Sequence, residues 1–465
     1  MSSIRIFKHH VHTAHIVLGC IESAICFFSV YFGSYIRFGE TVMVEEEDLL
    51  PLTVRAASFA AILIVSMTAL GVYQSQLREG QLGMLLRTAA SFLFASILLT
   101  LIFYIFPALF VGRGIFAFSM ICAFIMIVMV RYLYFKNINQ AILKRRILIL
   151  GAGTRANYIA ERLRRRVDTK GFEIFGFVRR KDEVDQITGY PIIDHEANLA
   201  HFSLENKIDE IVVAVNDRRS GLPIDELLDC KIHGIDVIEV ADFFEREIQR
   251  IELDLFQPSS MVFSDGFDRG FIRQFSKRVL DLSISVIMFI LVLPVLLLTA
   301  LAIRLEDGSK APVFYSQKRI GLDGRTFNVH KFRSMITDAE KAGAQWAEKN
   351  DTRITKVGGV LRKYRIDELP QLLNVLKGEM SLVGPRPERP EFVDKLGAKI
   401  PYYDKRHQVK PGVTGWAQIN YPYGASDEDA RQKLQYDLYY AKNNSLFMDL
   451  LVIIRTVETI LYDGQ

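Results

Sequence analysis

Long apolar segments constrain the fold of this chain more than any other feature of its sequence. Four of them occupy the first third, at about residues 15–36, 51–73, 89–111 and 115–134. Each is close to the roughly 20 residues that a helix needs to cross a bilayer. Because hydrophobic residues make up 50% of the chain, membrane segments explain its composition better than several soluble cores do. We therefore expect a multi-pass membrane protein with four transmembrane helices within residues 1–137.

Charges in the connecting segments orient these helices. Lysine and arginine gather before the first segment, after the second and after the fourth, whereas the loop at 40–48 is acidic. The positive-inside rule assigns the basic side to the cytoplasm. Two charges lie inside or near the apolar segments. We interpret Glu22 as a packing contact between helices, and Arg55 as a side chain that extends to the membrane surface.

Several other classes of function lack support in the composition. A formal net charge of +4 is too small to predict nucleic-acid binding, so we expect no nucleic-acid partner. The histidines at positions 9–15 are interpreted as a membrane flank rather than a metal site. Neither disulfides nor a zinc site is expected, because no two of the four cysteines form a CxxC pair. These are Cys20, Cys26, Cys122 and Cys230.

The middle of the chain changes character at residue 145. Residues 145–166 predict a strand, a glycine turn and a helix, which is the opening of a dinucleotide-binding unit. Gly151 and Gly153 fit that fingerprint, but Ala156 stands at its third glycine position, and the segment FEIFGFVRRKDE lacks an acidic residue at the expected ribose position. We predict a small Rossmann-like α/β domain over 138–255. Whether its glycine turn binds a nucleotide or only packs strand against helix stays open at this stage.

A fifth apolar segment, 279–303, follows a predicted linker at 256–274. It contains Asp281 and, in its middle, Pro294, which removes a backbone hydrogen bond. Basic residues flank both ends, with Lys277 and Arg278 before it, so both ends should lie on the cytoplasmic side. A hairpin that enters and leaves one leaflet satisfies this pattern. A kinked helix that crosses the bilayer is the alternative.

Two adjacent carboxylates, Asp367 and Glu368, precede a short helix that we expect to begin near Pro370 and to end at Gly378. Isolated acidic pairs at helix starts are ordinary caps. This pair differs because cations that suit phosphate surround it in the sequence. The candidate cations are Lys331, Arg333, Arg362, Arg365, Arg386 and Lys410. For Lys410, substrate binding and a structural turn remain equally open.

Four motifs in sequence order carry a resemblance to a known family: FSKRVLDLSIS, GLDGRTFNVHKFRSM, DELPQLLNVLKGEMSLVGPRPE and VKPGVTGWAQIN. Together they resemble bacterial sugar transferases, which move a sugar 1-phosphate from a nucleotide sugar onto polyprenyl phosphate. The resemblance covers residues 275–465 and implies a mainly α catalytic domain with a re-entrant membrane helix over 279–303. In that family a Ser-Pro pair bends the re-entrant helix, whereas here the pair is Leu293 and Pro294. The middle domain resembles a CoA-binding fold.

The same resemblance implies the chemistry. Asp367 would attack the sugar-bearing phosphate of a UDP-sugar and release UMP, and Glu368 would help to hold Mg²⁺. The acceptor would be polyprenyl (undecaprenyl) phosphate, at the cytoplasmic face of a bacterial inner membrane, as the first step of exopolysaccharide synthesis. The sequence leaves open the hexose, with glucose or galactose as first guesses, the polysaccharide pathway, and whether copies of the chain form a homo-oligomer.

Two other functions remain as alternatives. A nucleotide-sugar-modifying enzyme could use the glycine turn, but the middle domain lacks the Tyr-x-x-x-Lys pair that such enzymes use as a base. A non-catalytic membrane scaffold of a polysaccharide assembly complex would make the carboxylates incidental. Release of UMP from a UDP-sugar separates both alternatives from the transferase.

Overall fold

A computed structural model of the 465-residue chain describes most of it: residues 3–6, 9–39, 50–70, 72–73, 81–137, 144–163, 171–180, 187–194, 198–216, 222–255, 266–267, 269–308, 311–337, 352–422, 424 and 426–462. Lys8, Arg78, the acidic loop at 40–48, the histidine side chains at 9–15 and most of the linker at 256–274 lie outside the described part. Two compact units divide between Phe243 and Phe244, and each is described by itself.

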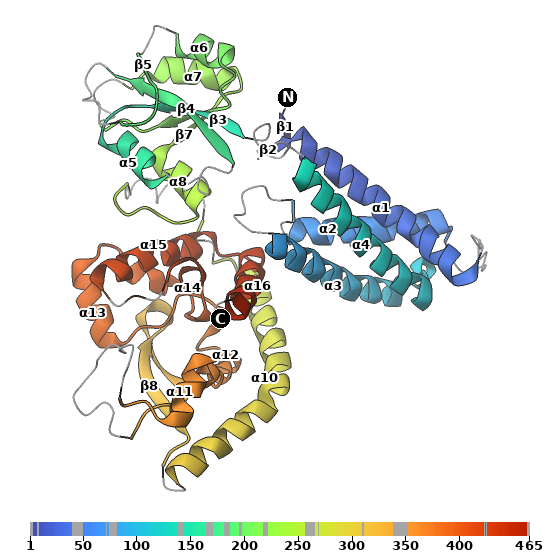
Figure 1. Cartoon of the computed structure of the whole chain (residues 1–465), viewed down its shortest axis with the longest axis vertical. Helices are drawn as coiled ribbons and strands as arrows, with labels where there is room; N and C mark the ends of the chain where they lie inside the picture. The colour runs from blue at the N-terminus through green and yellow to red at the C-terminus, as the bar shows by residue number, and fades with distance from the viewer. Residues whose placement is uncertain are drawn as a thin grey trace. The chain divides into compact units, whose positions relative to one another are not determined.

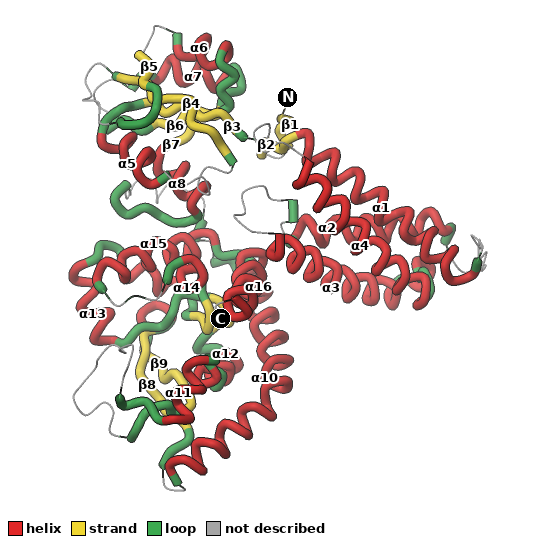
Figure 2. Tube along the Cα trace, viewed as in Figure 1, coloured by secondary structure: helices red, strands yellow, loops and turns green. Residues whose placement is uncertain are grey.

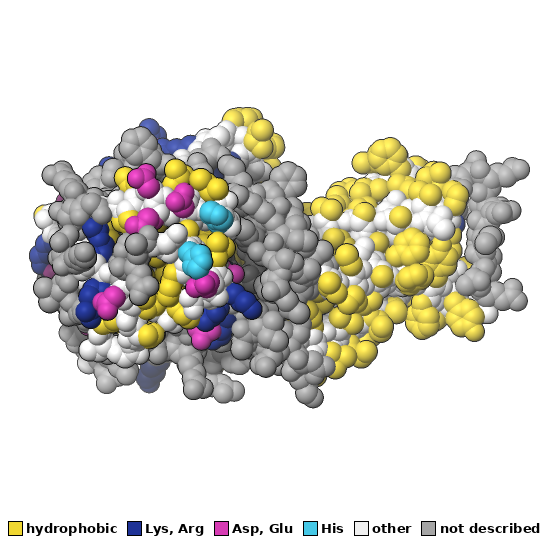
Figure 3. All heavy atoms as spheres, turned by 90° about the horizontal axis from the view of Figure 1, so that it is seen from above, with side chains coloured by type: hydrophobic (Ala, Val, Ile, Leu, Met, Phe, Trp, Pro, Cys, Tyr) yellow, Lys and Arg dark blue, Asp and Glu magenta, His cyan; other side chains and the backbone are white. Residues whose placement is uncertain are grey.

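Four helices form an N-terminal bundle (Figure 1). They are α1 (Thr13–Phe38), α2 (Leu52–Ala69), α3 (Gln81–Ile105) and α4 (Arg113–Asn137), preceded by the antiparallel strands β1 (Ser3–Ile6) and β2 (His9–His12). Three helices contain segments long and apolar enough to cross a membrane, and the apolar segment of α2 is shorter. Apolar side chains also cover the outside of the bundle (Figure 3), as expected for a surface in contact with lipid.

A buried ion pair lies inside the bundle. Glu22 on α1 accepts two hydrogen bonds from the Arg131 guanidinium on α4, at 2.5 and 2.7 Å, and a third from the Tyr73 hydroxyl at 2.5 Å. The interpretation of Glu22 as a packing contact between helices is therefore confirmed. The Arg55 side chain is 5% exposed, and its guanidinium donates to the Phe110 carbonyl, between α3 and α4, at 3.0 Å. Its extension to the membrane surface stays a prediction.

The α/β domain contains a five-stranded parallel sheet in the order β5-β4-β3-β6-β7. The strands are β3 (Arg145–Leu150), β4 (Phe172–Arg179), β5 (Ile192–Asp194), β6 (Glu210–Val213) and β7 (Asp236–Glu239). Helices α6 (Leu199–Glu205) and α7 (Ile224–Ile232) cover one face, and α5 (Thr154–Arg162) and α8 (Val240–Ile248) cover the other (Figure 2). This agrees with the predicted Rossmann-like topology. The central strand β3 is buried because both faces are covered.

The C-terminal unit begins with the 37-residue helix α10 (Phe271–Asp307). At a rise of about 1.5 Å per residue, a helix of this length measures about 55 Å, well beyond a bilayer core of about 30 Å. Pro294 lies inside it, and the helix changes direction along its course (Figure 1). Most of its apolar side chains are exposed, including Leu291 at 71% and Leu298 at 66%.

Helices dominate the rest of this unit, and two small sheets connect them. Strands β8 (Phe314–Ile320) and β9 (Thr326–Phe332) form an antiparallel hairpin, whereas β10 (Ser381–Val383) pairs in parallel with β11 (Gly412–Thr414). The helices are α11 (Lys356–Lys363), α12 (Gln371–Lys377), α13 (Pro390–Lys399), α14 (Trp416–Asn420), α15 (Asp427–Asn443) and α16 (Leu446–Tyr462). Met448, Leu451 and Val452 of α16 are buried, so this helix packs within its own unit.

Candidate active site

The two carboxylates lie on a short 3-10 turn, η3 (Ile366–Glu368), between α11 and α12. Arg365 begins this turn in the left-handed conformation, with φ at 53°. Helix α12 has Pro370 at its N-cap and ends at Gly378, whose φ of 89° suits glycine, so the predicted bounds of this helix are confirmed. The turn places Asp367 and Glu368 side by side immediately before the start of α12. Their surroundings nevertheless differ.

Glu368 is held by two cations from distant parts of the chain. Its Oε1 accepts from Lys331 Nζ at 2.7 Å and from Arg386 at 2.8 Å, while Arg365 lies 3.8 Å from Oε2. Burial opposes ionisation of this side chain, but the charges of Arg386 and Lys331 prevail and hold the pKa of Glu368 well below its usual range. Glu368 is therefore an ionised, fixed carboxylate that anchors both cations.

Asp367 is buried, with 8% of its side chain exposed, yet its carboxylate forms no hydrogen bond or ion pair with any described residue. Burial raises the pKa of Asp367, and the neighbouring charge of Glu368 adds to the rise. Lys331, Arg362 and Arg386 act in the opposite direction. Among the described residues, Asp367 is therefore a carboxylate in a cationic environment that no direct contact has neutralised.

Strand β9, which carries Lys331, is fixed to α12 by Asn374. The amide oxygen of Asn374 accepts from the backbone N–H of His330 at 3.1 Å, and its Nδ2 donates to the Asn328 carbonyl at 2.7 Å. Because Asn374 is fully buried, these contacts are shielded from water. Asn374 was not predicted as a site residue, although an asparagine on the apolar face of a short helix is a signal for a buried polar contact.

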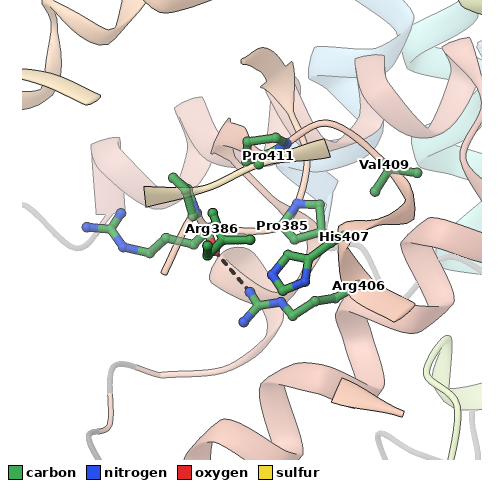
Figure 4. Close-up of a pocket in the computed structure, with 9 residues that line it drawn as sticks. Pro385, Arg386, Arg406, His407, Val409 and Pro411 are labelled. Carbon is green, nitrogen blue, oxygen red and sulfur yellow. Dashed lines mark hydrogen bonds between the residues drawn. The ribbon is translucent and has the colours of Figure 1, made fainter. Parts of the chain in front are cut away.

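Arg386 lies on the loop after β10, and Arg406 holds the backbone of that loop. The Arg406 guanidinium donates to the Arg386 carbonyl at 3.0 Å (Figure 4). The same guanidinium donates to the Tyr403 hydroxyl at 2.7 Å. It also pairs with the buried Asp437 on α15 at 2.7 Å. Neither member of this pair was predicted from the sequence, since they are 31 positions apart and no local pattern connects them.

A small hollow borders this loop (Figure 4). It is lined by Ile320, Gly321, Pro385, Arg386, Pro387, Arg406, His407, Val409 and Pro411. Burial and the charge of Arg406 lower the pKa of His407 to about 4, so this imidazole is neutral at physiological pH. The hollow therefore combines a neutral ring, prolines and the fixed backbone of Arg386.

Three glycines bring the Arg386 loop and the segment around Lys410 into direct backbone contact. A Cβ at Gly384 would overlap the Lys410 carbonyl oxygen, one at Gly412 the Gly384 nitrogen, and one at Gly415 the Gly384 oxygen. The N–H groups of Gly384 and Gly412 donate to the Thr414 and Pro385 carbonyls, at 2.9 and 3.0 Å. The GPRPE and VKPGVTG motifs are therefore parts of one structure, called the glycine seam below.

The predicted cations do not all converge on the carboxylates. Lys331 and Arg386 contact Glu368 directly. Arg365 lies near Glu368 with 61% of its side chain exposed. The charge of Arg362, on α11, favours ionisation of Asp367 and so lowers its pKa. Arg333 is buried, and its backbone N–H donates to the Val313 carbonyl at 2.9 Å. Neither Arg333 nor Lys410 contacts Asp367 or Glu368. Lys410 lies instead near the charged residues at the N-terminal end of α10. Burial and the charges of Arg278 and Lys277 lower the pKa of Lys410.

Residues near the N-terminal end of α10 connect this helix to the rest of the C-terminal unit. Lys277 lies 2.9 Å from Asp449 on α16 and 3.7 Å from Asp281. The Asp281 carboxylate accepts from Ser381 Oγ at 3.0 Å and from the Leu382 N–H at 3.1 Å. Arg278 donates to the carbonyls of Val375 and Leu376, at 2.6 and 2.7 Å, at the negative end of the α12 dipole.

Two protein families match this sequence. The family described as bacterial sugar transferase matches residues 272–463, and the family described as CoA-binding domain matches residues 68–228. The first match contains η3, β9, α12, the Arg386 loop and the glycine seam. The second contains most of the α/β domain with its glycine turn.

Curated relatives agree with the first match. A UDP-N-acetylgalactosamine-undecaprenyl-phosphate N-acetylgalactosaminephosphotransferase from Aeromonas hydrophila is 50% identical over 40% of this chain and 44% of its own length. An undecaprenyl-phosphate glucose phosphotransferase from Komagataeibacter xylinus is 32% identical over 68% and 59%, respectively. A UDP-galactose-lipid carrier transferase from Erwinia amylovora is 30% identical over 68% of both chains. The chain thus spans about half of the first two relatives.

Proposed function

The chain belongs to the bacterial sugar transferase family, and we propose that it transfers a sugar 1-phosphate from a UDP-sugar to polyprenyl phosphate and releases UMP. The names of the relatives support a phosphotransferase that acts on undecaprenyl phosphate. The observation that carries the proposal is the pair of carboxylates. Glu368 is bound by two cations, whereas the buried Asp367 beside it has no direct partner among the described residues.

In the proposed reaction Asp367 is the nucleophile. Its carboxylate oxygen forms a bond to the sugar-bearing phosphorus, and the bond between this phosphorus and the bridging oxygen breaks, so that UMP leaves with the bonding pair. A phosphate oxygen of polyprenyl phosphate then attacks the same phosphorus and frees the carboxylate. Covalent catalysis of this kind divides one difficult displacement into two easier steps. The raised pKa of Asp367 indicates a carboxylate that is more basic than an ordinary aspartate.

Lys331 and Arg386 stabilise the negative charge that spreads over the phosphate oxygens during transfer. Glu368 holds both cations beside Asp367, so they need no reorganisation when the donor binds. Arg362 and the exposed Arg365 are assigned to the diphosphate of the donor. Arg386 is suited to bidentate contact with phosphate, because its guanidinium is planar and its backbone is fixed by Arg406.

We also propose that Glu368 contributes to an Mg²⁺ site. No group of three or more histidine, cysteine or acidic side chains that could hold a metal occurs in the described part of the chain. Such a cage is not needed, since Mg²⁺ is commonly held by one or two carboxylates together with substrate phosphates. Cations occupy Glu368 Oε1, which leaves Oε2 and the Asp367 carboxylate as the available oxygens. The ion would neutralise charge on the diphosphate and on the leaving UMP.

The proposed organisation keeps the expected domains: a transmembrane region at 1–137, a Rossmann-like domain at 138–255, a linker at 256–274 and a catalytic domain at 275–465 on the cytoplasmic face of the inner membrane. Two features of α10 support a hairpin: basic residues flank both of its ends, and the helix changes direction along its course (Figure 1). Single cysteines at Ser276 and at Ser309, which lies outside the described residues, should both react from the cytoplasmic side. A periplasmic Ser309 would exclude the hairpin.

The covalent mechanism is tested by exchange of labelled UMP into a UDP-sugar in the absence of any lipid acceptor. Wild-type protein should catalyse this exchange, because UMP leaves before the acceptor binds. Absence of exchange, in protein that transfers sugar phosphate when lipid is added, would exclude the aspartyl intermediate. A scaffold would release no UMP under either condition, and a nucleotide-sugar-modifying enzyme would convert the UDP-sugar without releasing UMP.

A panel of donors identifies the sugar. The relatives are named for N-acetylgalactosamine, glucose and galactose, so these three UDP-sugars are the first members of the panel. The donor with the highest kcat/KM for UMP release in the presence of polyprenyl phosphate is the assigned substrate.

A further inference from the structure

The glycine turn of the α/β domain lies where a nucleotide would be expected to bind. Strands β4 and β5 lie on one side of β3, and β6 and β7 lie on the other, so the strand order reverses between β3 and β6. Parallel sheets bind ligands at such a point, with phosphate at the N-terminus of the following helix. The match to the CoA-binding domain implies a nucleotide-bearing ligand here. The contacts at the start of α5 test whether the residues fit one.

The side chain of Asn216, just beyond the end of β6, fills the phosphate position. Its Oδ1 accepts from the Thr154 hydroxyl at 2.8 Å and from the backbone N–H of Arg155 at 3.0 Å. A Cβ at Gly153 would collide with the Asn216 amide, so this amide lies directly against the turn. A donor group at the helix start that a phosphate would use is therefore already satisfied from within the domain.

Every position of the fingerprint has an internal explanation. Gly151 has a φ of 124°, which favours glycine in the absence of any ligand. Gly153 leaves room for the Asn216 amide, where the fingerprint glycine leaves room for a pyrophosphate. Ala156 is fully buried and packs the helix onto the sheet. Each of the three positions thus has a structural role that needs no ligand.

The residue at the end of the second strand is also unsuited to bind the ribose of a nucleotide. Dinucleotide-binding domains place an acidic side chain at the end of the second strand to accept from the ribose hydroxyls. Strand β4 ends instead at Arg179, which pairs with Asp194 at 3.4 Å. A guanidinium cannot accept a hydrogen bond from a hydroxyl.

From these contacts we infer that Asn216 permanently closes the phosphate position of the α/β domain and that the Gly151–Gly153 turn binds neither CoA nor a dinucleotide. The turn is a structural joint between β3, α5 and β6. A phosphate could enter only if the Asn216 amide left, and both of its hydrogen bonds to the start of α5 would then be lost.

Hydrogen–deuterium exchange on the full-length protein in detergent tests this inference, with CoA and NAD as separate probes at about 1 mM, roughly a thousandfold above a micromolar Kd. Neither probe should slow exchange in the segment 150–157 of the wild type. Asn216→Ala should speed exchange there about fivefold or more, since it removes a helix cap. Asn216→Asp keeps an acceptor of the same size and should preserve the protection.

Asn157→Ala is the matched control. Asn157 lies on the same helix and contacts Glu161 at 3.2 Å on the surface, so its removal should leave exchange at 150–157 unchanged. Slower exchange in this segment with either probe would overturn the inference. So would unchanged exchange in Asn216→Ala, because the amide would then not close the turn. Binding of CoA that leaves 150–157 unprotected agrees with the inference, which concerns this turn alone.

Discussion

The glycine turn of the α/β domain and the carboxylate turn of the C-terminal unit are both expected to meet phosphate, and they differ in what their polar groups contact. At the glycine turn, Asn216 already occupies the start of α5. At the carboxylate turn, Glu368 accepts from Lys331 and Arg386 through Oε1, while Asp367 beside it has no partner among the described residues. A motif that satisfies its own polar groups needs no ligand to account for it. A buried carboxylate left without a partner calls for one.

Substitution of Asp367 should have the largest effect on activity, and it tests the difference between the two turns directly. Asp367→Asn should lower both overall transfer and acceptor-free UMP exchange by at least about 10³-fold, because an amide cannot act as the nucleophile. Stability should change little, since the carboxylate has no hydrogen bond to lose within the described residues. Asp394→Asn, on the exposed face of α13, is the matched control and should leave both rates unchanged. Near-normal exchange in Asp367→Asn would remove the main difference between the two turns.

Loss of one cation should have the next largest effect. Arg386→Ala should lower kcat by about 10²-fold, in the range seen when one transition-state donor is removed. Arg386→Lys should recover only part of this, because an ammonium lacks the planar fork. Arg325→Ala, at an exposed arginine, serves as the control in the same kinetic assay. A change confined to KM would show that Arg386 binds the donor without stabilising the transition state.

The buried pair Arg406–Asp437 allows positioning to be separated from stability. Arg406→Met alone should lower the free energy of unfolding by about 3–5 kcal/mol, because it leaves Asp437 buried without a charge partner. Arg406→Met combined with Asp437→Leu should restore most of that stability. Transfer should nevertheless stay about tenfold below wild type, since the Arg386 carbonyl has lost its donor. Full activity in the double variant would reduce Arg406 to a stabilising residue.

Removal of residues 1–243, which contain the N-terminal bundle and most of the α/β domain, tests whether the glycine turn contributes to the chemistry. A chain that begins at Phe244 should keep exchange activity within about tenfold of wild type if neither part contributes. A chain that begins at residue 256 should be less stable, because it loses Ile251 from the core of the C-terminal unit and the hydrogen bond from Trp416 to the Gln249 carbonyl, at 2.9 Å. Burial of such a side chain contributes about 1.5–3 kcal/mol, measurable by urea unfolding.

The smallest effect concerns pH. The pKa of Glu368 lies below its ordinary value of 4.5, so its ion pairs contribute stability that is fully present above about pH 4.5. That contribution is lost as pH falls from 4.5 through the folded-state pKa. The stability advantage of the wild type over Glu368→Gln should therefore be constant between pH 6 and 8 and should shrink below about pH 4.5, as measured by thermal unfolding. A constant difference down to pH 3 would show that the cations do not favour the ionised form.

Local sequence signals predicted the elements with strong start and stop residues. Pro370 and Gly378 delimited α12 correctly, and the alternating strands and glycine turn indicated a parallel α/β domain. Contacts between distant residues were not predictable. Asn374, Arg406 and Asp437 act through partners that no spacing identifies. Lys331, at the end of β9, forms an ion pair with Glu368, whereas Arg333 follows the end of this strand at Phe332. Substrate binding by Arg333 stays a prediction.

The glycine seam limits how segments of this active site can be exchanged between related proteins. Because the backbones of Gly384, Gly412 and Gly415 touch with no room for a side chain, the two motifs cannot vary independently. A chimera that takes the GPRPE segment from one relative and the VKPGVTG segment from another must preserve all three glycines together. Crossover points for recombination among these enzymes should therefore lie before β10 or after α14, so that all residues between them come from the same parent protein.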